Sequence, residues 1–270
     1  MYDIFQAPFI REMKEMTANM YRMGWDERNG GNISVLLDAP VVEAFIDPAH
    51  VQETIGLSFD ASALAGRYVL VTRTGGYFKN IESRPQENLG LVRIAKDGGS
   101  YDVMWGFAGG GRPTSEFPTH LMNHIVRLKA DACHRVVLHC HPVNTLAMTF
   151  VHTLDEREFT RTLWKMCTEC MVVFPDGVGV LPWMVCGGNE IGEKTAEKIA
   201  DRRLVVWAQH GIFGTGRDMD EAFGLVETVE KAAEIYMKIL GHPIVQAYGD
   251  KELHALAEAF HLTPRAGYLD

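Results

Sequence analysis

A short apolar run that contains two histidines limits the folds open to this chain more than any other segment. The run 134-HRVVLHCH-141 has the β-branched composition of a buried strand, and Pro142 ends it. Side chains at positions i and i+2 of a strand point to the same face. His139 and His141 are therefore predicted to emerge together, while Cys140 points into the opposite layer.

A second apolar run, 203-RLVVWAQH-210, places another histidine in the same setting. His210 stands at the end of this run and is followed by Gly211. A lone His-x-His pair in a strand often has no metal-binding role, but two strand-terminal sites favour one. Three imidazoles that leave one position open are the usual protein ligands of a catalytic zinc ion. The sequence therefore predicts one zinc ion per subunit, with His139, His141 and His210 as ligands.

Two other groups of metal-binding residue types lack a complete pattern. His120 and His124 lie four apart on a predicted helix, a spacing that can hold a metal, but no further ligand accompanies them. Cys167 and Cys170 have the spacing of zinc or redox cysteines, yet the second pair that a four-cysteine site requires is absent from the sequence, so both thiols are interpreted as structural. Six more histidines fall in polar loops or on helix faces, where a surface role is expected: His50, His134, His152, His242, His254 and His261.

Periodicity and turn residues predict the remaining elements. Apolar residues at spacings of three and four predict a helix over 5–23 that ends at Gly24. The segments 89–95 and 101–105 flank an Asp-Gly-Gly turn and predict a hairpin. A helix with a hydroxyl residue at its cap is predicted to begin at 115–116 and to continue to 128. Further strands are predicted at 33–37, 68–72, 170–174 and 203–209, and further helices at 143–151, 156–167, 189–200, 218–240 and 250–261.

The order of these elements predicts an α/β fold. Strands come in pairs early in the chain and alternate with helices later, which indicates a sheet covered by helices on both faces. Of the 270 residues, 47% are hydrophobic, enough apolar side chain to close one substantial core. We therefore expect a single domain over residues 1–270.

Charge and cysteine content restrict the partners and the compartment. A net charge of −9 argues against a nucleic-acid surface, which needs a basic footprint. No stretch approaches the roughly 20 apolar residues of a membrane span, and the first residues lack the layout of a signal peptide. Five cysteines are an odd number that suits free thiols in a reducing compartment. The expected location is the cytoplasm.

Three short segments offer the donors that a phosphate group needs. They are 28-RNGGNIS-34, 72-TRTGG-76 and 113-PTSE-116, of which the last opens a helix. Helix N-termini and glycine-rich loops bind phosphate through unpaired N–H groups, so an acidic protein can hold an anion without a basic patch. Glu116 lies one residue beyond the hydroxyls of Thr114 and Ser115. Taken alone, a carboxylate in the first turn of a helix only complements the helix dipole.

Together these motifs resemble the class II aldolase and adducin family over nearly the whole chain. The motifs 29-NGGN-32, 72-TRTG-75, 114-TSE-116, 139-HCH-141 and 210-HG-211 follow the order and approximate spacing of the family. Longer strings resemble one branch, whose members cleave a phosphorylated six-carbon ketose: 25-WDERNGGN-32, 162-TLWKMCTECMVVFPDGVGVLPWM-184 and 207-WAQHGIFGTG-216.

The resemblance implies a fold, an assembly and an activity. The fold is one domain of three layers, α/β/α, with a central and mainly antiparallel sheet. The assembly is a cyclic homotetramer with active sites at subunit junctions. The activity is the zinc-dependent retro-aldol cleavage of a phosphorylated ketose to dihydroxyacetone phosphate and an aldehyde.

The resemblance also implies roles for individual residues. Glu116 is the catalytic acid and base, and Glu169 matches a carboxylate that reaches the site of a neighbouring subunit. The histidines His139, His141 and His210 hold the zinc ion. The residues around the phosphate are Asn29, Asn32, Thr74, Gly75, Thr114 and Ser115.

The sequence departs from the family pattern in one loop. The second loop reads Thr-Arg-Thr-Gly where the family has Thr-Gly-Ser-Gly, so Arg73 replaces a glycine and Thr74 a serine. The hydroxyl is kept, while the backbone at position 73 loses the freedom of glycine.

Three rival functions are also considered. They are a related enzyme for another sugar phosphate (a fuculose-phosphate aldolase, a pentulose-phosphate epimerase or a dehydratase), a non-catalytic assembly module as in adducin, and a zinc hydrolase.

Overall fold

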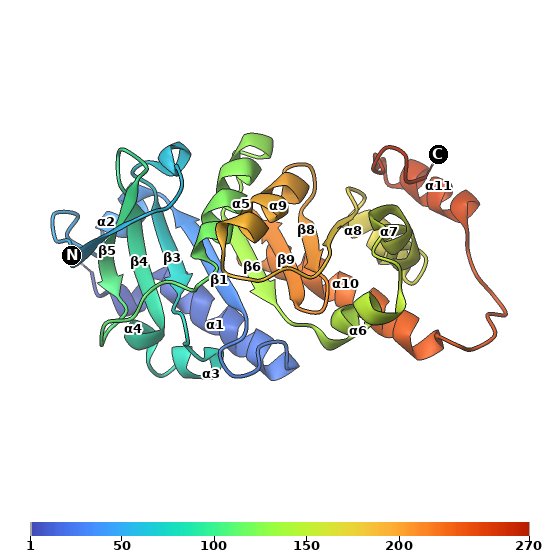
Figure 1. Ribbon diagram of the computed structural model, residues 1–270, viewed down its shortest axis with the longest axis horizontal. Coiled ribbons are helices and arrows are strands. Elements are labelled where there is room, and N and C mark those ends of the chain that lie inside the picture. Colours follow the sequence, from blue (N-terminus) through green and yellow to red (C-terminus); the bar gives the residue numbers. More distant parts are fainter. Residues whose placement is uncertain (1, 270) are drawn as a thin grey trace.

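A computed structural model describes residues 2–269, in which nine strands form one sheet between two layers of helices (Figure 1). The order across the sheet is β2-β5-β4-β3-β1-β6-β9-β8-β7, and only the β7/β8 pair is parallel. This arrangement confirms the expected three-layer fold with a mainly antiparallel central sheet. The strands are β1 (Asn32–Leu37), β2 (Glu53–Gly56), β3 (Tyr68–Thr72), β4 (Leu89–Ile94), β5 (Ser100–Gly106), β6 (Val136–Cys140), β7 (Val178–Leu181), β8 (Leu204–Trp207) and β9 (Gly211–Gly216).

Helices cover both faces of this sheet. Helices α5 and α9 lie side by side over one face, and α1 and α10 lie over the other (Figure 1). The helices are α1 (Pro8–Met23), α2 (Ala39–Glu43), α3 (Phe78–Ile81), α4 (Pro85–Asn88), α5 (Phe117–Ala130), α6 (Val143–Val151), α7 (Glu156–Trp164), α8 (Thr168–Val173), α9 (Asn189–Ile199), α10 (Met219–Ile239) and α11 (Asp250–Ala259), with short 3-10 turns at Ile4–Gln6 and Ser62–Leu64.

The two-residue period of β1 divides its side chains between the two helical layers. Ile33 and Val35 join the core beneath α1 and α10. Leu36 joins the core beneath α5, and Ser34 points to the same side, where it bonds two histidines of that helix. Because the period is two, Asn32 also faces the α5 layer. The strand therefore presents Asn32 and Ser34 to the N-terminal half of α5.

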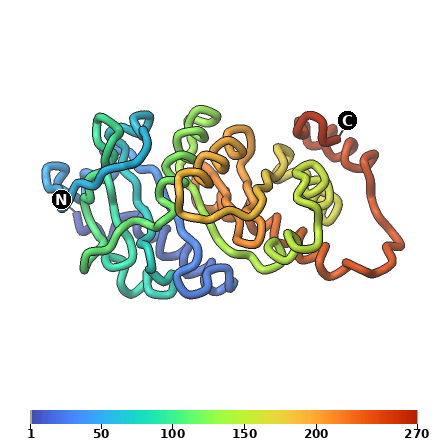
Figure 2. Tube along the Cα trace, in the orientation of Figure 1, coloured from blue at the N-terminus to red at the C-terminus, as the bar shows by residue number. Residues whose placement is uncertain are grey.

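The C-terminal segment leaves the sheet and returns as a separate helix. After α10 the chain arcs outward before α11 packs on α8 (Figure 2). The hydroxyl of Tyr248 donates to the carbonyl of Trp164 at 2.7 Å, and Arg161 forms an ion pair with Asp250 at 2.7 Å. These polar contacts fasten the returning segment to α7 beyond the β7 edge of the sheet.

The prediction of a strand at 170–174 is wrong. Residues Thr168–Val173 form helix α8, which buries Cys170 and Met171, and the strand comes one turn later as β7. A short uninterrupted apolar run has no periodicity that separates helix from strand. The chain instead turns at Gly177, which has φ 77°, before it enters the sheet.

The cap of α5 also differs from the prediction. The N-cap residue is Glu116, which makes no side-chain cap bond, and the hydroxyl of Thr114 accepts from the Glu116 N–H at 3.3 Å.

The sequence did not predict the short elements β2, α2, α3 and α4, nor the strand β9. The hairpin of β4 and β5 and the boundaries of β3 and α6 match the predictions. Among residues 2–269, none of the helices is long and apolar enough to cross a membrane.

Candidate metal and carboxylate site

Strand pairing brings the three predicted histidine ligands together. His139 is the second-last residue of β6 and pairs with Phe213 of β9. His141 is the first residue after the strand. The turn between β8 and β9 carries His210 back to this end of β6, because β9 lies between β6 and β8. Gly211 is required at this crossing, since a Cβ there would lie 2.4 Å from the carbonyl oxygen of Cys140.

The three imidazoles have the geometry of a metal centre. Their nearest ring nitrogens all lie within 4.8 Å of one another, so the group could hold a metal ion. The Nε2 atoms of His139 and His141 are 3.3 Å apart. Two nitrogens at about 2.0–2.1 Å from one tetrahedral zinc ion would be separated by about 3.3 Å. The donor set and its spacing therefore fit a zinc ion.

Burial keeps His139 and His210 in the neutral form that binds a metal. His139 is fully buried, and burial lowers its pKa well below the usual 6.5, with His141 and His210 lowering it further. Burial, and then the charge of His141, lowers the pKa of His210 to about 4. The Nδ1–H of neutral His139 donates to the carbonyl oxygen of Ile212 at 3.0 Å, which leaves the Nε2 lone pair free. Cys140 points into the opposite core, as predicted.

Glu27 orients the second histidine and was not singled out in the sequence. Its carboxylate lies 3.0 Å from Nδ1 of His141. The backbone N–H of His141 donates to the carbonyl of Trp25 at 2.8 Å. A carboxylate on the outer ring nitrogen fixes the tautomer and raises the basicity of the ligand nitrogen. Gly30 permits this approach, since a Cβ there would lie 2.9 Å from His141 Nδ1. Glu27 and His141 are 114 residues apart, so no local pattern could have indicated the pair.

Glu116 is a buried carboxylate that faces the histidines. It is 5% exposed, and its oxygens lie 3.7 Å from Nε2 of His139 and 3.8 Å from Nε2 of His210. Its Oε2 accepts from the amide of Asn32 at 2.9 Å. Burial raises the pKa of Glu116, while the bond from Asn32 and the charge of His141 oppose the rise. A buried carboxylate with a raised pKa beside a group of histidines that could hold a metal ion suits proton transfer.

The three predicted phosphate loops line the same cavity as the histidines and Glu116. Two backbone bonds join the loop after β3 to the loop before α5: Thr74 N–H donates to Arg112 O at 3.0 Å, and Thr114 N–H donates to Thr72 O at 2.9 Å. The loop after α1 lines the cavity beside them. The cavity has a volume of about 190 Å³. Its lining includes all six residues expected around a phosphate: Asn29, Asn32, Thr74, Gly75, Thr114 and Ser115.

Three residues have surroundings that the sequence did not indicate. Arg73 lines the cavity and donates to the carbonyl of Glu87 at 3.1 Å. Cys186, from the loop before α9, also lines it and lies within 4.8 Å of Glu116 and His210. Glu169 is not brought into the cavity: it is exposed on α8, where its carboxylate accepts from the thiol of Cys167 at 2.6 Å.

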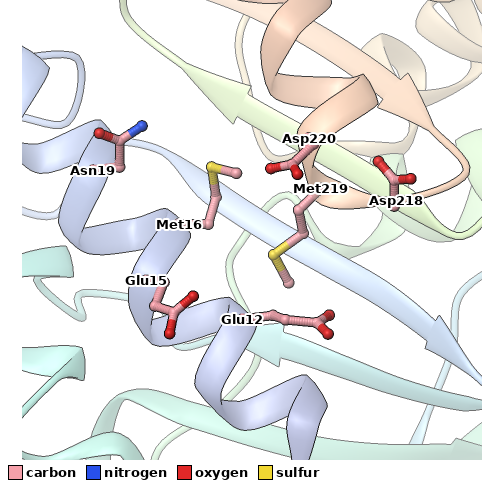
Figure 3. Close-up of a pocket in the computed structure, with 7 residues that line it drawn as sticks. All are labelled: Glu12, Glu15, Met16, Asn19, Asp218, Met219 and Asp220. Carbon is pink, nitrogen blue, oxygen red and sulfur yellow. The ribbon is translucent and has the colours of Figure 1, made fainter.

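A larger cavity elsewhere on the described surface has unsuitable chemistry. It measures about 430 Å³ and lies between α1 and the start of α10, as Figure 3 shows. Four carboxylates line it, from Glu12, Glu15, Asp218 and Asp220, together with two methionines and one asparagine. Glu15 contributes to the raised pKa of Glu12, after burial. Such a concentration of negative charge repels a phosphorylated substrate.

Fold and site together define a class II aldolase. The sequence matches the Class II Aldolase and Adducin N-terminal domain over residues 11–237, so the chain belongs to this family. It is 57% identical over 271 residues to the rhamnulose-1-phosphate aldolase of Listeria welshimeri serovar 6b, an alignment that covers 100% of this chain and 98% of that protein. It is 55% identical over 269 residues to the rhamnulose-1-phosphate aldolase of Listeria monocytogenes serotype 4a, with 99% and 98% covered.

A solved structure agrees with this assignment. The sugar-phosphate aldolase from Thermotoga maritima superimposes with a TM-score of 0.73 at 32% identity, covering 88% of this chain and 97% of that one. The family resemblance inferred from the short motifs is therefore confirmed.

Proposed function

We propose that the protein cleaves L-rhamnulose 1-phosphate reversibly to dihydroxyacetone phosphate and L-lactaldehyde. The observation that carries this proposal is the convergence, in one cavity, of three imidazoles, a buried carboxylate and three loops rich in hydroxyl and N–H donors. The full-length identity of 55–57% to rhamnulose-1-phosphate aldolases supports rhamnulose 1-phosphate as the sugar substrate.

His139, His141 and His210 would hold a Zn²⁺ ion, one in each subunit. When bound, this ion supplies the Lewis acidity that stabilises negative charge on the ketose oxygens. Neutral imidazoles keep the charge of the ion undiminished. The bonds to Ile212 and Glu27 hold two of the rings in place.

Glu116 would act as the acid and base. As the C3–C4 bond breaks, the C4 hydroxyl gives its proton to solvent water, and protonated Glu116 delivers a proton to C3, which gives dihydroxyacetone phosphate. Solvent then returns a proton to Glu116. In the reverse direction the Glu116 carboxylate removes the proton from C3. The buried position of Glu116 and its raised pKa support this role, because both favour uptake of a proton by its carboxylate.

The substrate phosphate would bind the loop residues. Thr74, Gly75, Thr114 and Ser115 supply hydroxyl and N–H donors, and Asn29 supplies its amide. In contrast, both side-chain atoms of Asn32 already have partners within the protein, namely Glu116 and His120. Asn32 would therefore contribute to the site mainly by holding Glu116.

We further propose that residues 1–270 form one domain and that the protein is a cytoplasmic homotetramer. Free thiols at all five cysteines suit a reducing compartment. Exposed apolar side chains near the cavity, such as Trp183 at 65% and Val185 at 75%, suit a subunit contact. Glu169 lies on the surface outside the cavity, which is compatible with a role in the site of a neighbouring subunit.

A coupled assay of dihydroxyacetone phosphate release tests the reaction. The zinc-loaded protein should release it from L-rhamnulose 1-phosphate faster than from L-fuculose 1-phosphate. Chelation should abolish release, and added zinc should restore it. Preference for the fuculose substrate, or full activity in metal-free protein, would contradict the proposal.

A further inference from the structure

A buried chain of hydrogen bonds leads away from Glu116 between the sheet and α5. It passes through five side chains, here called the histidine chain, which are in order Asn32, His120, Ser34, His124 and His134. None of them is more than 7% exposed. The proposed reaction uses only the first. His134, which the sequence placed on the surface, is buried here, so that expectation was wrong.

The contacts in the histidine chain are short and continuous. The Oδ1 atom of Asn32 bonds Nε2 of His120, and Nδ1 of His120 lies 2.6 Å from the hydroxyl of Ser34. The same hydroxyl lies 2.8 Å from Nε2 of His124. Nδ1 of His124 lies 2.8 Å from Nε2 of His134, which borders a surface depression near Asp131.

The bond between Asn32 and Glu116 fixes the direction of every other bond. The NH₂ of Asn32 donates to Oε2 of Glu116, so the amide oxygen of Asn32 faces His120 and accepts from it. His120 must then carry its proton on Nε2 and accept from Ser34 on Nδ1. The Ser34 hydroxyl has one proton, so it accepts from Nε2–H of His124. By the same logic, His134 donates from Nε2 to His124.

This ordering requires three neutral histidines, and their burial provides them. Burial lowers the pKa of His120 to about 3 and is the first cause of a pKa of about 3 at His134. It also places the pKa of His124 well below 6.5. With one proton on each ring, the histidine chain has two possible directions, and the donation from the Asn32 amide to Glu116 selects one.

The amide of Asn32 limits what the histidine chain can do. An amide nitrogen and oxygen do not exchange a proton as a hydroxyl or an imidazole does, so protons cannot pass from His134 to Glu116. The bonds can transmit orientation and polarisation, because successive hydrogen bonds in a buried chain strengthen one another.

We propose that the histidine chain is a positioning device, in which Ser34, His120, His124 and His134 hold the Asn32 amide so that it presents Glu116 to the substrate carbon in one orientation. This inference rests on the proposed role of Glu116. A merely structural polar cluster would stabilise the fold but would have no selective effect on turnover.

The substitution Ser34→Ala tests the proposal, since it interrupts the histidine chain without touching Asn32 or Glu116. The control is Thr17→Ala, which removes a fully buried hydroxyl from α1, where it donates to Met13 O at 2.8 Å. Three quantities are measured for each protein: kcat and KM for L-rhamnulose 1-phosphate, bound zinc, and the ¹⁵N shifts of the histidine side chains.

In the parent protein, His120, His124 and His134 should all show the Nε2–H tautomer. Ser34→Ala should lower kcat by about 10-fold to 100-fold, the range for residues that orient a functional group, with KM and zinc content little changed. The His120 signals should move in Ser34→Ala but not in Thr17→Ala. His120→Gln, which keeps a donor toward Asn32, should retain more activity than His120→Leu.

The Nδ1–H tautomer at His120 in the parent protein would overturn the proposal. So would a Ser34→Ala protein that has normal zinc content and kcat within twofold of the parent. The tautomers are measured without substrate, so a parent protein inactive toward this sugar would contradict the proposed function and leave the direction of the bonds to be decided by the spectra.

Discussion

The substitution Glu116→Gln separates proton transfer from the other contributions to catalysis. Glutamine has nearly the same size, and its side-chain oxygen can keep the 2.9 Å bond from Asn32. It cannot accept a proton from carbon. Loss of a positioned acid–base group lowers turnover by about 10²–10⁴, or about 2.7–5.4 kcal/mol in the activation barrier. Stability should not fall, because burial already disfavours the charged form of Glu116.

The assay is steady-state release of dihydroxyacetone phosphate, with bound zinc measured on the same samples. The control is Glu12→Gln, the same change in the acidic cavity between α1 and α10, which should leave kcat unchanged (Figure 3). A Glu116→Gln protein with normal zinc content and kcat within tenfold of the parent would refute the assignment of Glu116 as the acid and base.

The surroundings of His141 and the buried histidines of the α5 layer can also be tested by substitution and by pH. Glu27→Ala should weaken zinc binding by about 10-fold, since it removes the carboxylate on His141 Nδ1; an unchanged dissociation constant in a chelator competition would contradict this. Gly30→Ala should reduce bound zinc, because a Cβ there would lie 2.9 Å from His141 Nδ1, whereas Gly224→Ala, on an open part of α10, should not. Acid should destabilise the metal-free protein: unfolded histidines take up protons near pH 6.5, while folded His120 and His134 resist protonation down to about pH 3, so stability is lost as the pH falls through this interval. The loss should reach up to about 1.4 kcal/mol per pH unit for each histidine, and urea midpoints that do not change between pH 7 and 5 would count against it.

Patterns within single segments could be predicted from the sequence. The period of two in a strand put His139 and His141 on one face, and the spacing of apolar residues gave the long helices. These features depend only on residues that are near one another in the chain. The short apolar run at 170–174 was mispredicted for the same reason, because nothing within the run distinguishes α8 from a strand.

The sequence by itself therefore determined the sheet-and-helix pattern, the paired histidines and the family. The tertiary structure decided which distant residues complete the site: Glu27 on His141, Asn32 on Glu116, and His134 inside rather than on the surface. The physical reason is the order of the strands. Because β6 lies between β1 and β9, residues up to 114 positions apart meet at one end of these three strands. No local periodicity in the sequence indicates that pairing.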